Sequence, residues 1–334
     1  MRGKIKVFSS FLLIAILGGL IFFLLNQPVG DPSQPRIVEI HKGTSFHEVA
    51  DRLQKENLIA HTWFFNGMAR ITGEDRKIIP GEYEFHAGMR PTEILSKLVE
   101  GRIYYHTVTI PEGYTIEQIA SLLSSKELTD RATFIQLTRD PGMIHSLNLN
   151  VPTLEGYLFP DTYFFSRPIS PHTIIRTLVR RFWEVFAPAY LARTRDLEMT
   201  VQEVLTLASV IEKETSLSQE RPLVSGVFHN RLRKKIPLQS DPTVIYAMKN
   251  FDGHIRKEDL QVESPYNTYL MVGLPPGPIA NPGEEAIHAA LFPTPTDFVY
   301  FVSRNDGSHE FSSTLEEHNR AVEKYQRNRG KQAS

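Results

Sequence analysis

The clearest helical pattern in the chain runs from Val201 to Thr215, in the sequence VQEVLTLASVIEKET. At about 100° per residue its apolar side chains fall on one arc of a helix, and Glu212 lies inside that arc, four residues after Ala208 and seven after Leu205. A carboxyl group on the apolar side of a helix loses solvation, which raises its pKa. An acid that keeps its proton near neutral pH can serve as a general acid. The pattern therefore predicts a helix and nominates Glu212 as a proton donor.

The same helix also has a plainer interpretation. Glu212 lies near its C-terminal end, where a side chain can bend out to water, and Leu207 and Val210 make the opposite face partly apolar. The helix can therefore be buried nearly all round. Periodicity nominates Glu212 but leaves its role open.

The longest apolar run of the sequence lies near the N-terminus. Val7 to Leu25 contains no ionisable residue, and three basic residues precede it. As a helix the run spans about 28 Å, close to the ~30 Å hydrocarbon core of a bilayer. A signal peptide is the alternative, but its apolar core is usually only about 7–15 residues and ends at a small-x-small cleavage site. We therefore predict a cytoplasmic tail at 1–6, an uncleaved transmembrane helix at 7–25 and a linker at 26–36, with the rest of the chain outside the cytoplasm.

An internal repeat follows the linker. Residues 38–58 align without gaps on residues 108–128, and Gly43 of the first copy meets Gly113 of the second. Each copy predicts a short strand, a glycine turn and an amphipathic helix. With a further helix and strand, residues 37–88 resemble the LysM module, a small fold that binds the N-acetylglucosamine of cell-wall glycans. A purely structural repeat without glycan contact is the alternative.

These patterns define the expected fold class and domains. We predict an α+β fold with a LysM-like βααβ subdomain at 37–106 and a second strand–helix repeat with a connector at 107–150. A larger mixed α+β domain is expected at 151–330.

Composition and motifs exclude several classes of function. The chain has 334 residues, a formal net charge of −1 and no cysteine. It therefore lacks the basic excess of nucleic-acid binding driven by phosphate neutralisation, and it cannot form disulfides or thiolate sites. The sequence has no HExxH motif, P-loop or dinucleotide fingerprint, so we expect no metal and no cofactor. Ser209 lacks the elbow motif of serine hydrolases.

Two stretches outside the helix carry further candidate residues. In LQSDPTVIYAM (238–248), Asp241 precedes a proline and can act as a helix cap, whereas Gln239 has no such local role and is a candidate for a substrate hydrogen bond. Glu155 lies in the aromatic stretch TLEGYLFPDTYFF (153–165). Exposed aromatic and polar groups can line a carbohydrate cleft, although such residues also pack at domain edges.

Residues 264–283 form a long loop that is rich in proline and glycine. The loop contains five prolines and three glycines, which exclude a regular helix or a central strand. Long loops of this kind in compact domains are usually functional. Asn267, flanked by Tyr266 and Tyr269, can recognise an N-acetyl or hydroxyl group, or it can simply close a turn.

Five collinear motifs carry a resemblance to a known family. They are LASVIEKET (207–215), ERPLVSGVFHNRL (220–232), LQSDPTVIYAM (238–248), PYNTYLMVGLPPGPIANPG (265–283) and HEFSSTLEEHN (309–319). In these motifs the chain resembles the YceG-like family of endolytic murein transglycosylases, also called MltG. The resemblance implies cleavage of the β-1,4 bond between N-acetylmuramic acid and N-acetylglucosamine in nascent peptidoglycan, with a 1,6-anhydromuramic end. It assigns the catalytic role to the first glutamate of the VIEKE motif, which is Glu212.

The implied chemistry needs one acid rather than two. Ordinary glycosidases use a pair of carboxyl groups. In a lytic enzyme the 6-hydroxyl of the muramic acid attacks the anomeric carbon itself, and such an intramolecular attack can reach an effective molarity of order 10⁵ M. Glu212 is then expected to protonate the leaving oxygen and afterwards to take the hydroxyl proton. The residues nominated for substrate contact are Gln239, Asp241, Asn267, Tyr269, Glu155 and Glu214.

Together these observations predict a single-pass protein of the inner membrane, with a cytoplasmic N-terminus and a periplasmic catalytic domain at 151–330. Its expected partners are peptidoglycan glycan strands, the inner membrane through residues 7–25, and cell-wall synthases (penicillin-binding proteins); no nucleic acid is expected. Two alternatives stay open: a non-catalytic glycan-binding scaffold for the synthases, and a muramidase that hydrolyses the same bond.

Overall fold

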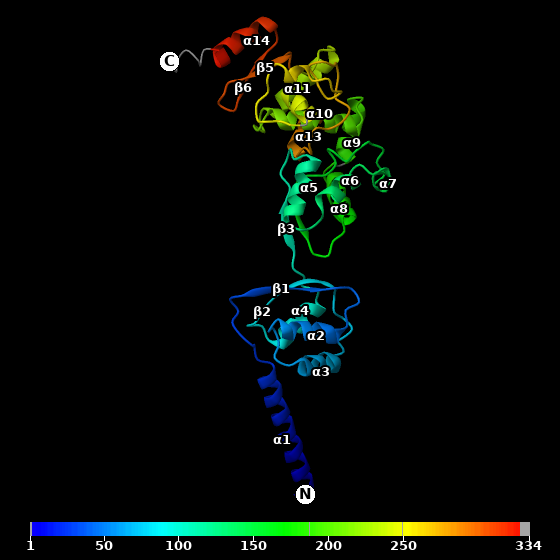
Figure 1. Ribbon diagram of the computed structural model, residues 1–334, viewed down its shortest axis with the longest axis vertical. Coiled ribbons are helices and arrows are strands. Elements are labelled where there is room, and N and C mark those ends of the chain that lie inside the picture. Colours follow the sequence, from blue (N-terminus) through cyan, green and yellow to red (C-terminus); the bar gives the residue numbers. More distant parts are fainter. Residues whose placement is uncertain (1, 187, 249, 328–334) are drawn as a thin grey trace. The chain divides into compact units, whose positions relative to one another are not determined.

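The computed structural model describes residues 2–186, 188–248 and 250–327, and the side chains of residues 2–9, 11 and 327 lie outside that description (Figure 1). The chain divides into two compact units. Unit 1 comprises Met1–Thr107 with Phe164–Ile169, and unit 2 comprises Val108–Tyr163 with Ser170–Ser334. The mixture of helices and small sheets confirms the predicted α+β class.

Unit 1 contains a strand–helix–helix–strand order followed by a further helix. Its elements are α1 (Arg2–Leu25), β1 (Pro35–Ile40), α2 (Phe46–Lys55), α3 (Thr62–Thr72), β2 (Gly81–His86) and α4 (Pro91–Val99). β1 and β2 pair in antiparallel fashion, with Val38 opposite Tyr83. Both side chains are buried in a core with apolar residues of α2, α3 and α4. This order agrees with the predicted βααβ pattern, while the likeness to a LysM module stays a prediction.

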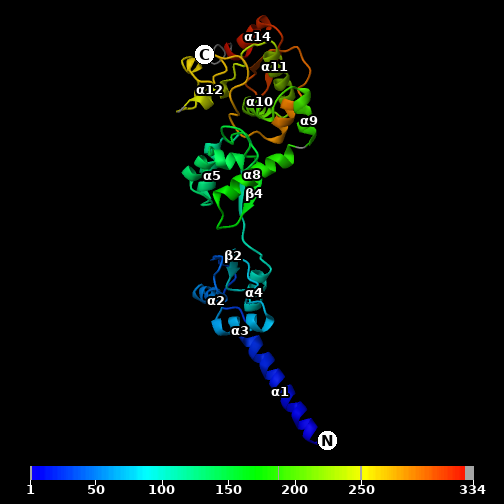
Figure 2. The ribbon, with the colours of Figure 1, turned by 90° about the vertical axis from the view of Figure 1, so that its right-hand side faces the viewer.

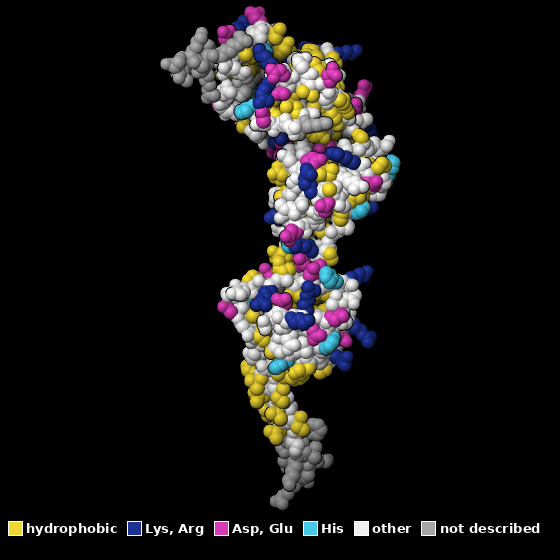
Figure 3. All heavy atoms as spheres, in the orientation of Figure 1, with side chains coloured by type: hydrophobic (Ala, Val, Ile, Leu, Met, Phe, Trp, Pro, Cys, Tyr) yellow, Lys and Arg dark blue, Asp and Glu magenta, His cyan; other side chains and the backbone are white. Residues whose placement is uncertain are grey.

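The helix α1 carries the predicted membrane segment. Hydrophobic side chains gather over the part of α1 whose side chains are described (Figure 3), and Leu13, Ile14 and Leu24 are each more than half exposed. Among the helices that the structure describes, none meets the length and apolarity needed to cross a bilayer. The predicted span 7–25 includes residues 7–9 and 11, whose side chains lie outside the described part. The transmembrane assignment therefore stays a prediction.

Unit 2 is mainly helical. Its first part contains β3 (His106–Thr109, whose first two residues belong to unit 1), α5 (Ile116–Ser125), α6 (Arg131–Leu137), α7 (Pro141–His145), β4 (Thr162–Phe165, whose last two residues belong to unit 1), α8 (Pro171–Val185) and α9 (Pro188–Asp196). Its second part contains α10 (Val201–Glu214), α11 (Arg221–Arg233), α12 (Asp241–Ala247), a 3₁₀ turn (Asp259–Gln261), α13 (Glu284–Leu291), β5 (Tyr300–Ser303), β6 (His309–Ser312), α14 (Leu315–Val322) and a π turn (Glu323–Arg327).

The repeat predicted from the sequence is visible in the helix starts. Ser45 is the N-cap of α2 and Thr115 is the N-cap of α5. In each, the cap hydroxyl accepts a hydrogen bond from the backbone N–H three residues later, and the side chain of that later residue (Glu48 or Gln118) accepts one from the backbone N–H of the cap. This reciprocal capping box satisfies two backbone N–H groups that a helix start leaves unpaired. The two copies therefore begin their helices in the same way, as their alignment predicts.

The helix α10 forms the centre of unit 2 and packs against α11, α12 and α13 (Figure 2). Thr200 and Glu203 close its N-terminus with another capping box. All eight residues from Val204 to Ile211 are buried, so the helix is covered on every side along that stretch. It ends at Glu214, after which Thr215 has extended backbone. The predicted helix is confirmed, and so is its burial nearly all round.

Candidate functional site

Glu212, on the last turn of α10, is fixed by two strong donors. Its side chain is 6% exposed, and Oε1 accepts a hydrogen bond from Nη2 of Arg221 at 2.9 Å. Oε2 accepts from the backbone N–H of Gly283 at 3.0 Å. Gly283 is the N-cap of α13, where the helix dipole favours a negative charge. Arg221 is itself buried and also pairs with Glu285 at 3.0 Å and with Glu112 at 3.6 Å.

The contacts of Glu212 suit a carboxylate. Burial raises the pKa of Glu212 above its ordinary value, although the Gly283 N–H and the Arg221 charge act in the opposite direction. Hydrogen bonds from charged and backbone donors stabilise the ionised form. The Glu212 carboxyl therefore joins α10 to α11 through Arg221 and to α13 through Gly283. It forms a buried ion pair, and the catalytic role that the resemblance assigns to it stays a prediction.

Glu214, two residues further, has different surroundings. Its carboxyl accepts a hydrogen bond from the hydroxyl of Ser240. Burial raises the pKa of Glu214 to about 7, with a further increase from the negative charge of Asp241; the Ser240 bond and Arg231 act in the other direction. An acid with such a pKa is partly protonated at neutral pH, as a general acid must be.

The Glu214 carboxyl lines a cavity of about 330 Å³, which we call the Glu214 cavity. Four residues nominated from the sequence meet there: Glu214, Gln239, Asp241 and Tyr269. The phenol of Tyr269 donates to Oδ1 of Asp241 at 2.6 Å. Gln239 has a φ of 50°, in the left-handed region that residues other than glycine seldom adopt. Its backbone N–H donates to the carbonyl of Thr268 at 3.0 Å, which ties it to the long loop.

Arg231 lines the Glu214 cavity and makes several hydrogen bonds there. Its guanidinium is buried and donates to the carbonyl oxygens of Leu238 at 3.0 Å and Val299 at 2.6 Å, and to Oε1 of Gln239 at 3.2 Å. It also lies 5.3 Å from the ring centre of Tyr300. Arg231 was not nominated from the sequence, because its partners include backbone carbonyl groups that a sequence pattern does not reveal. It holds the 238–239 segment against the end of α11.

Two histidines that belong to no metal-binding or catalytic motif, His309 and His318, also line the Glu214 cavity. His309 contacts the carboxyl of Glu220 through Nδ1 at 2.7 Å. Burial lowers the pKa of His318, whose ring stacks on Tyr300. Within residues 2–186, 188–248 and 250–327, no three histidine or acidic side chains gather in an arrangement that could hold a metal ion.

The structure places Asn267 outside the Glu214 cavity. The residue is fully buried, and its Nδ2 donates to the carbonyl oxygens of Leu260 and Val262 at 3.0 and 2.9 Å. Its Oδ1 accepts from the backbone N–H of Tyr269 at 3.0 Å. These bonds shape the loop, which favours the alternative in which Asn267 closes a turn.

Glu155 is a third buried carboxyl, at a separate position. It accepts from the N–H of Ile116 at 3.0 Å, from Nδ2 of Asn281 at 2.8 Å and from the Tyr246 hydroxyl at 3.3 Å. Burial raises the pKa of Glu155 to about 8, although all three donors favour its charged form. Asn281, which the sequence analysis did not nominate, also accepts from the N–H of Gly156 at 2.9 Å. Glu155 thus connects the start of α5 to the long loop.

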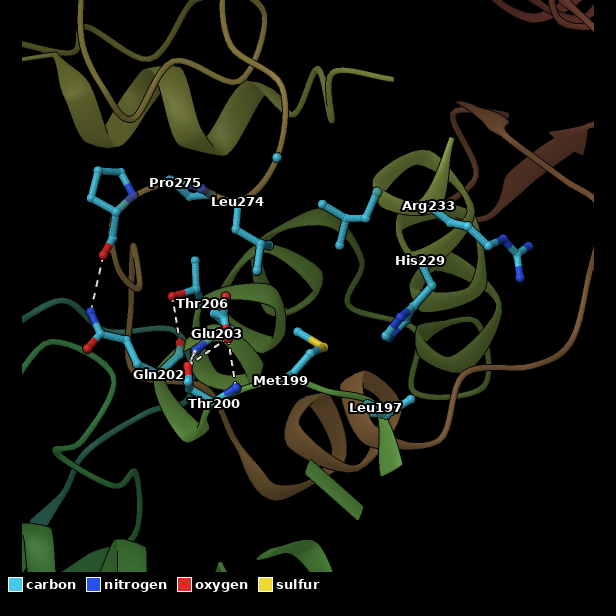
Figure 4. A pocket seen from close by; sticks show the side chains of 13 residues that line it. Leu197, Met199, Thr200, Gln202, Glu203, Thr206, His229, Arg233, Leu274 and Pro275 are labelled. Atoms are coloured by element: carbon cyan, nitrogen blue, oxygen red, sulfur yellow. Dashed lines mark hydrogen bonds between the residues drawn. The ribbon is translucent and has the colours of Figure 1, made fainter. Parts of the chain in front are cut away.

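A second and larger cavity, of about 690 Å³, lies beside the N-terminal half of α10 (Figure 4). We call it the Thr206 cavity. Gln202 of α10 donates to the carbonyl of Pro276 at 3.1 Å and so joins the helix to the loop. The His229 ring lies 2.8 Å from the carbonyl of Ala290, and burial lowers the pKa of His229. The Thr206 cavity therefore has a fixed wall formed by α10, α11 and the loop.

Comparison with known proteins gives consistent similarities. Residues 38–324 match the model of the YceG-like family. The chain is 34% identical over 329 residues to the endolytic murein transglycosylase of Bacillus subtilis (strain 168), covering 93% of this chain and 91% of that protein. It is 31% identical over 318 residues to the protein of the same name from Streptococcus pneumoniae serotype 2 (strain D39 / NCTC 7466), covering 85% of this chain and 57% of that protein. It also resembles the crystal structure of a YceG-like protein from Listeria monocytogenes, with a TM-score of 0.61 and 34% identity, over 86% of this chain and 98% of that one.

Proposed function

The chain belongs to the YceG-like family, and from this membership and the buried acid of the Glu214 cavity we propose that it is an endolytic murein transglycosylase. It cleaves the β-1,4 bond between N-acetylmuramic acid and N-acetylglucosamine within a strand and leaves a 1,6-anhydro end. The observation that carries the proposal is a buried carboxyl that lines a cavity of about 330 Å³ together with Asp241, Gln239 and Tyr269.

The reaction uses Glu214 first as an acid and then as a base. As the bond between the anomeric carbon and the bridging oxygen breaks, its electron pair stays on that oxygen, which takes the Glu214 proton. The 6-hydroxyl oxygen of the muramic acid then bonds to the anomeric carbon and gives its proton to the Glu214 carboxylate. The attack is intramolecular, so positioning supplies much of the rate, and no activated water is required.

The neighbours of Glu214 support this assignment. The Asp241 charge raises the pKa of Glu214 and can also stabilise positive charge that develops on the sugar. Tyr269 orients Asp241 through its 2.6 Å bond. In the part of the chain that the structure describes, the side-chain NH₂ of Gln239 has no protein partner, because Arg231 bonds to its oxygen instead. That NH₂ group is free to donate to a sugar hydroxyl or N-acetyl carbonyl.

Glu212, to which the resemblance assigns the catalytic role, is the rival proton donor. Its two oxygens accept from Arg221 and from the N–H of Gly283, and it is absent from the described walls of the Glu214 cavity. An acid that donates its proton must reach the substrate and regain that proton afterwards. We therefore propose Glu214 as the acid, and Glu212, the residue that the resemblance implies, is the alternative that the same variants test.

Product analysis tests the proposed activity. Purified protein is incubated with isolated murein, and the ends of the fragments are identified by mass spectrometry. We expect 1,6-anhydromuramic ends from within the strands. Reducing ends instead establish the muramidase alternative, and intact strands that still bind the protein establish the glycan-binding scaffold.

We also propose that residues 7–25 anchor the protein in the inner membrane, with its body in the periplasm next to cell-wall synthases of the penicillin-binding class. The uncharged apolar run after three basic residues supports the anchor. Leu17→Arg, which places a charge within the run, is expected to release the protein from carbonate-washed membranes. Continued membrane retention of this variant contradicts the anchor.

A further inference from the structure

We propose that α3 is a second membrane contact of unit 1 and lies along the bilayer surface, with the side chains of Trp63 and Ile71 at the boundary between lipid headgroups and acyl chains. This inference rests on the proposed anchor at residues 7–25, because that anchor brings unit 1 to the bilayer. It assigns a lipid-binding surface to a helix that has no part in the proposed reaction.

Hydrogen bonds hold the end of α1 to the rest of unit 1. Asn26, the first residue after α1, donates to the hydroxyl of Thr92 and accepts from the backbone N–H of Thr92, both at 3.1 Å. The backbone N–H groups of Val29 and Gly30 donate to the carbonyl oxygen of Ala87, at 3.1 and 3.0 Å. Unit 1 therefore begins directly at the end of the proposed anchor, and these bonds fix which of its sides faces the bilayer.

The helix α3 lies beside the C-terminal end of α1 in both ribbon views (Figures 1 and 2). The ring of Phe22 in α1 contacts the ring of Phe64 in α3, with centroids 5.7 Å apart. Phe22 precedes Leu25, the last residue of the apolar run, by about 5 Å along the helix axis. Because the run is about as long as the hydrocarbon core is thick, Phe64 lies close to the depth at which the acyl chains meet the headgroups.

The outward face of α3 exposes large apolar side chains. The buried residues of α3 belong to the core of unit 1. Trp63 and Ile71, by contrast, are 63% and 88% exposed. At about 100° per residue, these two side chains and Phe64 fall within about 100° of the helix circumference. The apolar strip of α3 is therefore continuous with the side chain that contacts α1.

The composition of this face suits a boundary between lipid and water. Tryptophan is enriched at membrane interfaces, where its ring lies at the level of the headgroups. Arg70 is exposed and follows Trp63 by seven residues, which brings the two to within about 20° of the same helix face. A guanidinium group at that position can bind the phosphates of anionic lipids.

A sugar is the alternative ligand for Trp63. Its side chain also lines a cavity of about 340 Å³ with Phe46, His47 and Arg70, and a sugar ring could stack on an indole there. Ile71 does not line that cavity, although it is the more exposed of the two apolar side chains. The exposed Ile71 and the contact of α3 with the proposed anchor therefore favour lipid.

The two tryptophans of the chain, Trp63 and Trp183, allow a direct test. Full-length Trp183→Phe is reconstituted into vesicles of phosphatidylethanolamine and phosphatidylglycerol with brominated acyl chains, which quench nearby tryptophans. We expect the Trp63 emission to fall about twofold relative to vesicles without bromine. In the control Trp63→Phe, the emission of Trp183 is expected to stay unchanged, because its ring packs within unit 2 against Phe182 and Phe186.

A matched pair of variants in the Trp183→Phe background tests the face itself. Ile71→Glu places a charge on the lipid-facing strip and is expected to reduce the quenching about twofold. Ile37→Glu is the control, because Ile37 is half exposed on β1, on the sheet face opposite to the core that α3 joins. It is expected to leave the quenching unchanged. Equal quenching in these two variants contradicts the lipid contact of α3.

Retention in carbonate-washed membranes distinguishes this inference from the anchor on which it rests. If the protein is retained but Trp63 is not quenched, the anchor stands and the inference is overturned. If the protein is released, the anchor and the inference fail together. If the Trp63 emission responds to soluble murein fragments and not to brominated lipid, the sugar alternative holds and the inference is likewise overturned.

Discussion

Glu212 and Glu214 lie on the last turn of α10 with only Lys213 between them, yet their carboxyl groups have different partners. Both are removed from water, and burial raises the pKa of both. Glu212 is surrounded by an arginine and a backbone N–H at a helix start. Glu214 faces a cavity that it shares with a second acid, Asp241. Burial alone therefore does not make a general acid, since the partners decide whether the proton is held and whether a substrate can reach it.

Glu155 extends this comparison to a third carboxyl. Burial raises its pKa to about 8, above the value of about 7 for Glu214, yet its three partners are all structural. A raised pKa is thus shared by structural and chemical sites. What distinguishes Glu214 is the combination of that pKa with a cavity.

The largest expected effect is on murein-cleaving activity, and it distinguishes Glu214 from Glu212. Glu214→Gln removes the proton donor and is expected to lower murein cleavage by about 10²–10⁴-fold with the fold intact. The matched variant Glu212→Gln is expected to keep activity within about tenfold, because Arg221 retains its other partners. Release of fragments, measured by chromatography, gives both rates, and circular dichroism checks the fold. A fully active Glu214→Gln with a folded, inactive Glu212→Gln reverses the two roles.

The next effect concerns stability in the Glu212 region. Arg221→Met leaves the buried Glu212 carboxylate without its cation, which is expected to lower the free energy of unfolding by about 3–5 kcal/mol. Urea unfolding measures this loss. Arg180→Met is the control, because its exposed pair with Glu184 is expected to contribute less than about 1 kcal/mol. Equal stability of both variants contradicts a structural ion pair at Arg221.

A smaller effect is a pH dependence of stability that comes from Glu155. Its pKa rises from an ordinary 4.5 to about 8 on folding, so the folded protein binds more protons than the unfolded chain between these values. The free energy of unfolding is therefore expected to fall as the pH rises from about 5 to 8. Glu155→Gln should flatten this slope. The raised pKa values of Glu212 and Glu214 add to it, whereas the lowered pKa values of His229 and His318 act in the opposite direction. An unchanged slope in urea titrations across this pH range contradicts the assignment.

Local patterns allowed much of unit 2 to be predicted from the sequence. The helical spacing after Thr200 predicts α10, because capping and apolar periodicity act within a few residues. The turn at Asn305–Gly307 likewise predicts the β5–β6 hairpin, which the structure confirms. Gln239, Asp241 and Tyr269 were nominated individually, and the fold brings them together with Glu214.

Periodicity and the family resemblance both favour Glu212 over Glu214, and the contacts that distinguish the two could not be predicted from the sequence. Glu212 lies closer to the apolar arc, but its partner Arg221 belongs to the next helix and its partner Gly283 lies 71 residues away. Because of these tertiary contacts, Glu212, which periodicity favours, forms an ion pair with Arg221. Arg231 was missed for the same reason, since its partners are backbone carbonyls of Val299, just before β5, and of the 237–238 segment.

The most direct measurement of the central claim is kcat/KM for murein cleavage against pH in the wild type, Asp241→Asn and Glu212→Gln. Glu214 must carry its proton to act, so kcat/KM in the wild type is expected to fall as the pH rises past about 7. Asp241→Asn removes a negative charge that raises the pKa of Glu214 and should move the midpoint to lower pH, whereas Glu212→Gln should leave it in place. If the midpoint is lost in Glu212→Gln and is unchanged in Asp241→Asn, the result contradicts the assignment of Glu214 as the acid.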